Sequence, residues 1–451
     1  MRNNIVIFAI LVGIIFPFCV SKMYTFSLVN NNAEEEYTSF YLNGKMFDGT
    51  GNDKAYDCQF SLSFFSPVVG FYEETYPYDY SQESGTASLL DFNNILNLEF
   101  GQEGKKGKGG LRLTGEDKEV SIDDTIVFLS EDQRNANEKA LNSIGLSYSM
   151  VNGVNSKGFD KSESTLELFK NNLSIKKIFS IKQWTRTLYA FKSKFSSTLC
   201  LGEQHSDFSD TDNVGNCPIA NTDSPFWNCQ FSQMTLNNKN FSLINPTTEK
   251  LYEVRFIIES KKIVFPTRFK NLIAVQYSST GSECYIDTTT KKTELLLCKQ
   301  MTEDDEDTIP IRFLNANGTV QLKGEIDNEN YLSDWTDVSP FPTNIYFDNI
   351  DYIVMPLLVF KKFHVLFDGE NNKISFFSED KSLLKLIEQK EEKKETEDET
   401  DNLEYFKNHI FTTILIIAIV CLVIGLMVSI CCSGKNAPTS IKIEGPVNDD
   451  E

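Results

Sequence analysis

The sequence predicts a mainly β protein, and three observations lead to this expectation. Between residues 23 and 378, short apolar runs alternate with turn signals about every ten residues, which is typical of a β-sandwich or barrel. Helical periodicity is scarce in this region, and residues 165–178 are its best case. At 451 residues the chain is long for one domain and suits two.

The first 21 residues have the pattern of a secretory signal peptide. A charged Arg2 precedes a short apolar run, and the small residue Ser21 ends the segment. We expect cleavage after Ser21, and an uncleaved N-terminal anchor is the alternative.

Residues 410–430 form the second long apolar segment and contain no charged residue. A run of this length suffices to cross a hydrocarbon core of about 30 Å. Together with the signal peptide it predicts a single-pass type I membrane protein with a cytosolic tail at 431–451. The bulk of the chain would lie in the secretory lumen, in a vacuole- or lysosome-like compartment, or at the cell surface. Cys431 and Cys432, at the membrane edge, are candidates for palmitoylation, with unmodified thiols as the alternative.

An acidic stalk at 379–409 is expected to connect the β region to the membrane. Residues 379–404 hold 11 acidic residues and 5 lysines. We expect a helix at 382–394 followed by a solvated spacer, and a docking site is the alternative. The net charge of the whole chain is −21, which disfavours a nucleic-acid partner.

Cysteines and sequons agree with a secretory location. Six cysteines lie between the two apolar segments, at 58, 200, 217, 229, 284 and 298. Cys284 and Cys298 flank a turn-like run and form the best candidate disulfide, whereas the pairing of the other four stays open. With three histidines and no paired CxxC spacing, we expect neither a metal nor a cofactor. Candidate N-glycosylation sites are Asn172, Asn240 and Asn317.

The segment Ile353–Phe377, called the closing segment below, carries the most specific signal. Two apolar runs, Phe367-Asp368, an Asn-rich turn and a last apolar strand follow each other in it. This order resembles the end of the pepsin-like aspartic peptidases (peptidase A1). Further blocks fit that family in the right order: Leu98–Gly101, Ser143–Leu146, Leu199–Glu203, Trp227–Leu236 and Ile309–Phe313. The resemblance implies a bilobal β-barrel fold with lobes at 22–185 and 186–378.

The same resemblance implies two catalytic aspartates, one from each lobe, that share a proton and a water. The aspartate positions fall on Ser63 and Glu259, and the glycines two residues later are replaced by Phe65 and Lys261. The flap tyrosine falls on Phe100, which cannot donate a hydrogen bond.

Other assignments of the catalytic positions fit less well. Asp48 is followed by Gly and Thr in the wrong order, Asp57 precedes the apolar strand, and Asp287 lacks the glycine. The basic, glycine-rich run 105–110 is expected at the tip of the flap, either to influence the cleft or as a solvated turn.

These observations predict a membrane-anchored, catalytically inactive pseudo-peptidase that binds polypeptide or another partner in a retained cleft. One alternative is a divergent active endopeptidase that uses Glu259 with a second carboxylate not yet placed. The other is a structural surface protein whose cleft is filled.

Overall fold

The computed structural model describes the region 23–378 with internal gaps. The gaps are 31–39, 49–54, 72–80, 91–99, 117, 131–141, 190–191, 205, 207, 210–211, 279–282, 289–293, 300–308, 316–319, 327–340 and 361–362. The expected signal peptide, acidic stalk, apolar segment 410–430, Cys431, Cys432 and Asn317 lie outside the described residues. Among the helices that are described, none has the length and apolar character needed to cross a bilayer.

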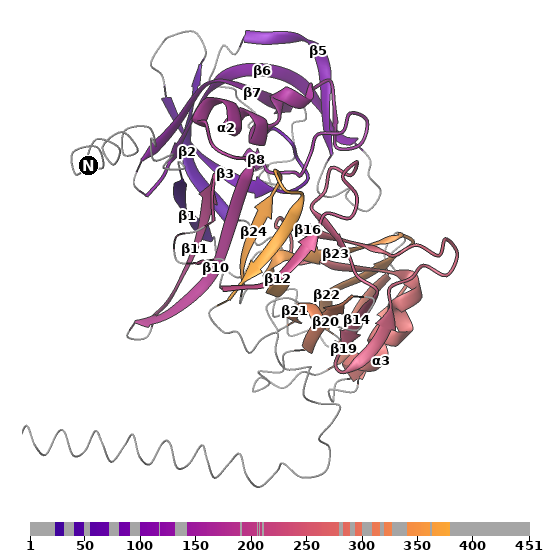
Figure 1. Cartoon of the computed structure of the whole chain (residues 1–451). Helices are drawn as coiled ribbons and strands as arrows, with labels where there is room; N and C mark the ends of the chain where they lie inside the picture. The colour runs from indigo at the N-terminus through magenta and orange to yellow at the C-terminus, as the bar shows by residue number, and fades with distance from the viewer. Residues whose placement is uncertain are drawn as a thin grey trace, which may run out of the picture. The chain divides into compact units, whose positions relative to one another are not determined.

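The described part is mainly β and is arranged in three sheets (Figure 1). The first sheet has 14 strands in the order β12-β25-β24-β10-β11-β1-β2-β3-β8-β4-β7-β6-β5-β9. Its strands from the N-terminal half of the chain are β1 (Tyr24–Asn30), β2 (Phe40–Asp48), β3 (Ala55–Ser63), β4 (Val69–Phe71), β5 (Ser81–Leu90), β6 (Phe100–Thr114), β7 (Glu119–Ser130), β8 (Asn142–Gly145), β9 (Ser156–Lys157), β10 (Ile178–Tyr189) and β11 (Lys192–Leu201). The strands β12 (Asn213–Pro218), β24 (His364–Asp368) and β25 (Lys373–Phe377) complete it from the C-terminal half.

The other two sheets come from the C-terminal half alone. The seven-stranded sheet contains β13 (Asn228–Gln230), β16 (Glu253–Ile257), β23 (Tyr352–Pro356), β17 (Ile263–Pro266), β22 (Phe341–Asp348), β19 (Glu294–Lys299) and β18 (Glu283–Asp287), in that order. The four-stranded sheet contains β15 (Lys239–Ser242), β14 (Gln233–Leu236), β20 (Ile309–Leu314) and β21 (Val320–Ile326). The described connections between these strands include two α-helices, α2 (Thr165–Leu173) and α3 (Lys270–Ser278). They also include the 3₁₀ turns η2 (Lys161–Glu163), η4 (Thr267–Phe269) and η5 (Leu357–Phe360).

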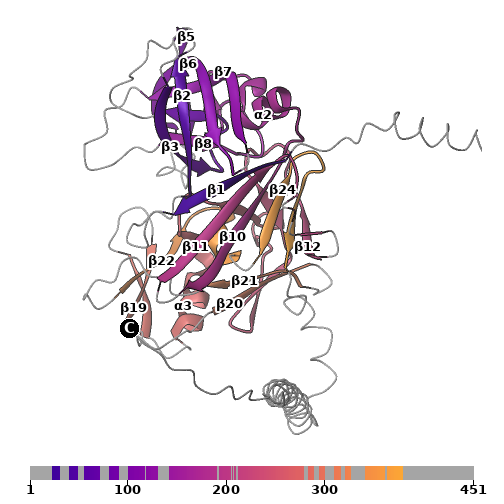
Figure 2. The same ribbon diagram turned by 90° about the vertical axis from the view of Figure 1, so that its left-hand side faces the viewer.

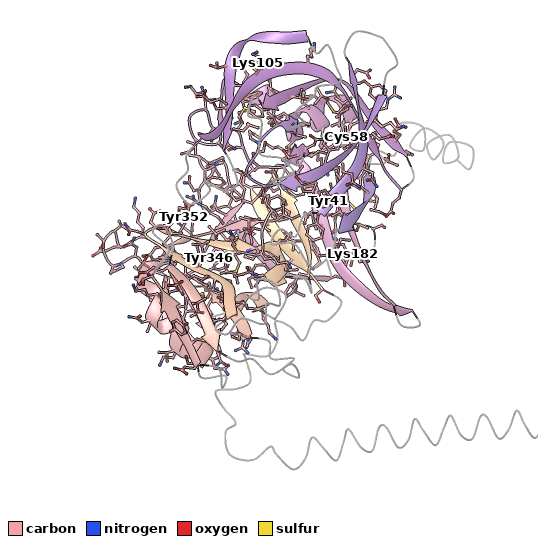
Figure 3. The ribbon with its side chains drawn as sticks, turned by 180° about the vertical axis from the view of Figure 1, so that it is seen from behind. Tyr41, Cys58, Lys105, Lys182, Tyr346 and Tyr352 are labelled. Atoms are coloured by element: carbon pink, nitrogen blue, oxygen red, sulfur yellow. A yellow bond between two sulfur atoms is a disulfide. The ribbon has the colours of Figure 1, made fainter. Side chains whose placement is uncertain are left out.

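A closed barrel forms within the first sheet, because β2 pairs with β6 as well as with β3. The barrel order is β2-β3-β8-β4-β7-β6, and closure leaves these strands without a free edge inside the barrel. The run 105–110 lies in the middle of β6, paired with β5 and β7, so its expected position at a hairpin tip is wrong. Lys105, on this strand, is labelled in Figure 3.

Gly110, at the end of this run, serves close packing between strands instead of a turn. A side chain at Gly110 would meet Cβ of Phe47 on the neighbouring β2 at 3.2 Å. The guanidinium of Arg112 stacks over the same Phe47 ring at 3.9 Å. The glycine therefore lets β6 and β2 pack closely where Gly110 pairs with Phe47.

The helix expected at 165–178 is present but shorter. Ser164 caps its start, because its side chain accepts a hydrogen bond from Glu167 N. The helix ends at Leu173, since Ser174 adopts a left-handed conformation with φ of 55°. The chain then enters β10 at Ile178, and β10 runs across the expected lobe boundary at 185/186.

The closing segment forms β23, η5, β24 and β25, so its expected strand–turn–strand pattern is confirmed. The Asp368 carboxylate fixes the turn, because it accepts hydrogen bonds from Glu370 N (3.1 Å), Asn371 N (2.9 Å) and Asn371 Nδ2 (2.7 Å). Asn372 takes the left-handed position that the hairpin requires, with φ of 52°. β24 then pairs with β10, and the two strands lie side by side in Figure 2.

A cluster of aromatic side chains joins the N-terminal and C-terminal halves of the chain. Phe367 stacks on Phe179 at 4.8 Å and meets Phe64 edge-on at 4.9 Å. Trp227 packs on both Phe179 and Phe367, and its Nε1 donates to the carbonyl oxygen of Leu146 at 2.7 Å. Such rings supply much of the apolar area that a core buries.

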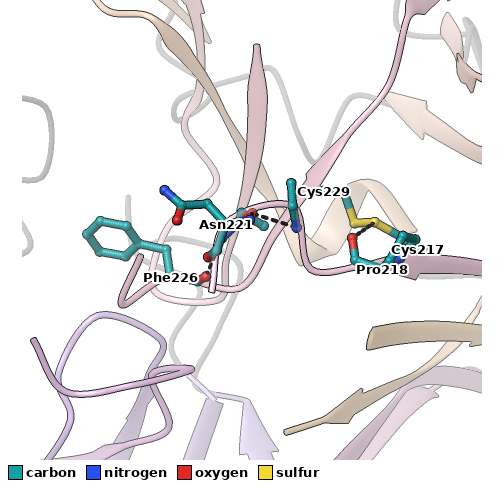
Figure 4. Close-up of a disulfide and its surroundings, with 7 residues drawn as sticks. Cys217, Pro218, Asn221, Phe226 and Cys229 are labelled. Atoms are coloured by element: carbon teal, nitrogen blue, oxygen red, sulfur yellow. Dashed lines mark hydrogen bonds between the residues drawn. A yellow bond between two sulfur atoms is a disulfide. The ribbon is translucent and has the colours of Figure 1, made fainter. Parts of the chain in front are cut away.

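Two disulfides are present among the described residues. Cys284 and Cys298 face each other on β18 and β19 and are bonded, which confirms the expected pair. Cys217 and Cys229 form the second disulfide (Figure 4), a pairing that the sequence left open. Cys58 and Cys200 are buried.

Candidate functional site

Two strand–turn–strand motifs with the same register lie one in each half of the chain. In the first motif β3 pairs in parallel with β8, so that Ser63 lies opposite Gly145, and β4 returns antiparallel with Gly70 opposite Ser143. In the second motif β16 pairs in parallel with β23, so that Ile257 lies opposite Pro356. There β17 returns antiparallel with Val264 opposite Val354.

The spacings show which residues of the two motifs correspond. Seven positions separate Ser63 from Gly70, and seven separate Ile257 from Val264. The partner strands agree, because Gly145 lies two residues beyond Ser143, as Pro356 lies two beyond Val354. Ile257 is therefore the counterpart of Ser63.

This register corrects the expected assignment of the second catalytic position. Glu259 lies two residues beyond Ile257 and corresponds to Phe65, the residue at the glycine position of the first motif. Ile257, which occupies the counterpart of Ser63, is 1% exposed and carries no ionisable group. The sequence placed Glu259 there because Glu259 is the acidic residue nearest to the end of an apolar strand.

Glu259 nevertheless contacts Ser63 directly. Its Oε1 atom accepts hydrogen bonds from Ser63 Oγ at 2.8 Å, from Phe65 N at 3.2 Å and from Phe64 N. Its other oxygen, Oε2, accepts from Ile258 N at 2.9 Å. The two expected site residues are thus brought together, although they are not counterparts.

Ser63 is fixed on its other side by its own turn. Its Oγ accepts hydrogen bonds from Ser66 N at 3.0 Å and from Phe65 N at 3.3 Å, and the residue is 9% exposed. The buried Asn155 supports the turn, since its Nδ2 donates to the carbonyl oxygen of Phe65 at 3.1 Å and its Oδ1 accepts from Val151 N at 2.9 Å. No sequence signal pointed to Asn155, whose role depends on a contact 90 residues away along the chain.

Phe65 points into an apolar cluster whose other members belong to the C-terminal half. It is 3% exposed, and its ring meets that of Phe226 at 5.4 Å. The other buried members of this cluster are Ile257, Val264, Tyr352 and Val354. Arg255 borders it, because its guanidinium stacks over Tyr352 at 3.7 Å and over Phe226 at 4.8 Å. Tyr352 and the neighbouring Tyr346 are labelled in Figure 3.

The electrostatics of the site depend on a single carboxyl group. Burial raises the pKa of Glu259 above its ordinary value, and hydrogen bonds from Ile258 N, Ser63 and Phe65 N oppose that rise. A buried carboxyl with raised pKa is a common feature of general acids. Two carboxyl groups are needed to share a proton. The corresponding positions of the two motifs hold Ser63 and Ile257, and neither residue has a carboxyl side chain.

The remaining expected site residues that the structure describes lie on other elements. Phe100 begins β6 and pairs with Leu90, and residues 91–99 lie outside the described residues. Asn172, on α2, and Asn240, on β15, are both exposed. Among the described residues, no group of three or more His, Cys, Asp or Glu side chains is placed to hold a metal ion.

Comparison with known proteins gives a likeness of fold. No protein-family model and no curated protein sequence matches the chain. Among solved structures, the crystal structure of basic 7S globulin from soybean is similar, with a TM-score of 0.54 and 9% sequence identity. The similarity covers 79% of this chain and 96% of that chain. The two proteins therefore share a mainly β fold over most of their lengths, and at this identity the likeness concerns the fold alone.

Proposed function

We propose that the chain is a catalytically inactive, pepsin-like pseudo-peptidase with two lobes, which binds polypeptide or another partner. The two motifs of equal register support the bilobal assignment, because each places one turn at the corresponding point of its half. The likeness to basic 7S globulin, which extends over most of both chains, is consistent with one fold for the whole region.

One observation carries the proposal of inactivity: the counterpart positions of the two turns hold Ser63 and Ile257. An aspartic peptidase needs two carboxyl groups that share one proton, because one then acts as acid while the other acts as base. A serine hydroxyl does not hold a shared proton as a carboxylate does, and an isoleucine side chain holds none. Glu259 alone lacks its partner.

The hydrogen bonds of Glu259 also oppose catalysis. Oε1 already accepts three hydrogen bonds, and Ser63 Oγ, which donates one of them, accepts two more from its own turn. A water positioned for attack would have to displace these bonds. The geometry therefore favours a structural role for this carboxyl.

A structural surface protein is the second candidate, and the packing of Phe65 favours it. Its ring lies in an apolar cluster beside Ile257, where a peptidase would need space for substrate. In either case we propose that residues 410–430 anchor the chain in a membrane as a single span, as their length and apolar character suggest.

Incubation of the full chain in detergent micelles with an unfolded protein tests the proposal. We expect no cleavage between about pH 2 and pH 7, the range over which a carboxyl pair can share one proton. An active pepsin-like enzyme in the same micelles is the positive control. Cleavage that is inhibited by a pepstatin-type compound and lost in Glu259→Gln would refute the proposal and establish the active alternative.

A further inference from the structure

The Glu259 carboxyl divides its hydrogen bonds unequally between its two oxygens. All three donors from the N-terminal half, Ser63 Oγ, Phe64 N and Phe65 N, bind the same atom, Oε1. Oε2 accepts from Ile258 N, and the backbone amide of Glu259 also donates to the carboxyl, so these further donors belong to the same turn as Glu259. A proton can therefore occupy Oε2 while Oε1, as a carbonyl oxygen, keeps every bond to the other half of the chain.

The surroundings of Glu259 contain little charge to hold it ionised. The first turn, residues 63–66, and strand β8 have no ionisable side chain. In its own turn Lys261 is buried, and Nζ of Lys262 lies 5.3 Å from the centroid of the Tyr346 ring. On β16, Arg255 is paired with Glu253 at 3.2 Å. Within the described residues Glu259 forms no ion pair, so burial dominates its titration.

The corresponding residue of the first turn makes the reverse contact. Phe65 is the counterpart of Glu259 and inserts its ring among side chains of the C-terminal half, such as Phe226 and Ile257. Each turn thus places one side chain in the opposite half, one apolar and one ionisable. The contact joins the halves at the point where an active enzyme would keep its cleft open.

We propose that Phe65 and Glu259 form a pH-sensitive latch between the two halves of the chain. It is tight while the Glu259 carboxyl is protonated and loosens when this group ionises. Because burial disfavours the charged form, the folded chain binds this proton more strongly than the unfolded chain does. The stabilisation is fully present below the pKa of the unfolded state and is lost as the pH rises through the higher pKa of the folded state. The latch does not depend on the proposed loss of catalysis, and the two experiments have separate readouts.

Hydrogen exchange of the full chain in detergent micelles tests the latch. Protection factors are measured for the amides of Phe64 and Phe65 at about pH 4 and about pH 7, each corrected for the intrinsic exchange rate. The wild type is compared with Glu259→Gln, whose side chain retains an Oε1 acceptor but cannot ionise. Glu249→Gln is the matched control, because Glu249 is an exposed acid of the C-terminal half.

We expect the ratio of wild-type to Glu259→Gln protection to be larger at the lower pH. It should change about tenfold for each unit by which the pKa is raised. The ratio of wild-type to Glu249→Gln protection should stay constant. An equal ratio at both pH values, or a larger one at the higher pH, overturns the latch.

A second variant keeps the test valid if Glu259→Gln fails to fold. Ser63→Ala removes one of the three donors and leaves the carboxyl in place. Its turn should be less protected than that of the wild type at both pH values, and its protection should still fall as the pH rises. A flat profile in Ser63→Ala contradicts the proposal.

Discussion

Replacing Phe65 by alanine removes a phenyl ring from the apolar cluster of the C-terminal half. The ring is 3% exposed and packs against Phe226, Ile257 and Val264. The favourable free energy of burying the ring is lost, and the surroundings collapse only partly into the cavity that it leaves. Buried Phe→Ala substitutions of this kind cost about 3–5 kcal/mol.

The expected shift in melting temperature follows from this cost. Each kcal/mol lowers Tm by about 2–4 °C in domains of 150–250 residues, and the lower value suits a larger domain. We therefore expect Tm to fall by about 6–10 °C in a calorimetric scan of the full chain. The matched control is Val275→Ala on α3, where the side chain is 62% exposed and the cost should stay within about 0.5 kcal/mol.

The result that refutes this reasoning is a Phe65→Ala variant that melts with the Val275→Ala control. The ring would then contribute no packing between the halves. The apolar part of the latch and the argument for a filled cleft would fail together.

Two further predictions concern the joint between the halves and the disulfide framework. Trp227→Phe removes the indole donor to the Leu146 carbonyl oxygen and should lower the free energy of unfolding by about 1–3 kcal/mol, as measured by urea denaturation. An unchanged urea midpoint would mean that water replaces the indole as the donor. Replacing both Cys284 and Cys298 by serine removes a disulfide with a sequence separation of 14 and should lower the free energy of unfolding by about 3 kcal/mol in the same assay. The control is the wild type under reducing conditions, and the variant should lose no more stability than that sample does.

The sequence allowed the closing segment to be predicted because its signals are local. Alternating apolar residues, an aspartate that caps the turn and an asparagine with positive φ lie within a few residues of one another. The Cys284–Cys298 pair is local for the same reason, since the two strands are joined by a short connection. Local chemistry of this kind does not depend on the rest of the fold.

The counterpart of Ser63 in the C-terminal half was predicted at the wrong residue because the register there depends on strands far away in the sequence. Which residue corresponds to Ser63 is decided by the pairing of β16 with β23, about a hundred residues apart, so the sequence alone left a choice between neighbouring positions. The run 105–110 was misplaced for a related reason. Its glycines indicated a turn, whereas Gly110 is required by the close approach of Phe47 on another strand.

Phe65 and Glu259, the third residues of their turns, both contribute to the contact that joins the two halves. In the family that the sequence resembles, the third position of each turn is a glycine, which leaves space for the backbone to pass close. In this chain Phe65 and Glu259 occupy those two positions, and each fills that space with a side chain that binds the other half. Phe65 supplies apolar contacts and Glu259 supplies hydrogen bonds, so replacing one of them by glycine should remove one contribution and leave the other. Within the proposal of inactivity, Ser63 and Ile257 account for the missing pair of carboxyl groups, whereas Phe65 and Glu259 account for the contact between the two halves.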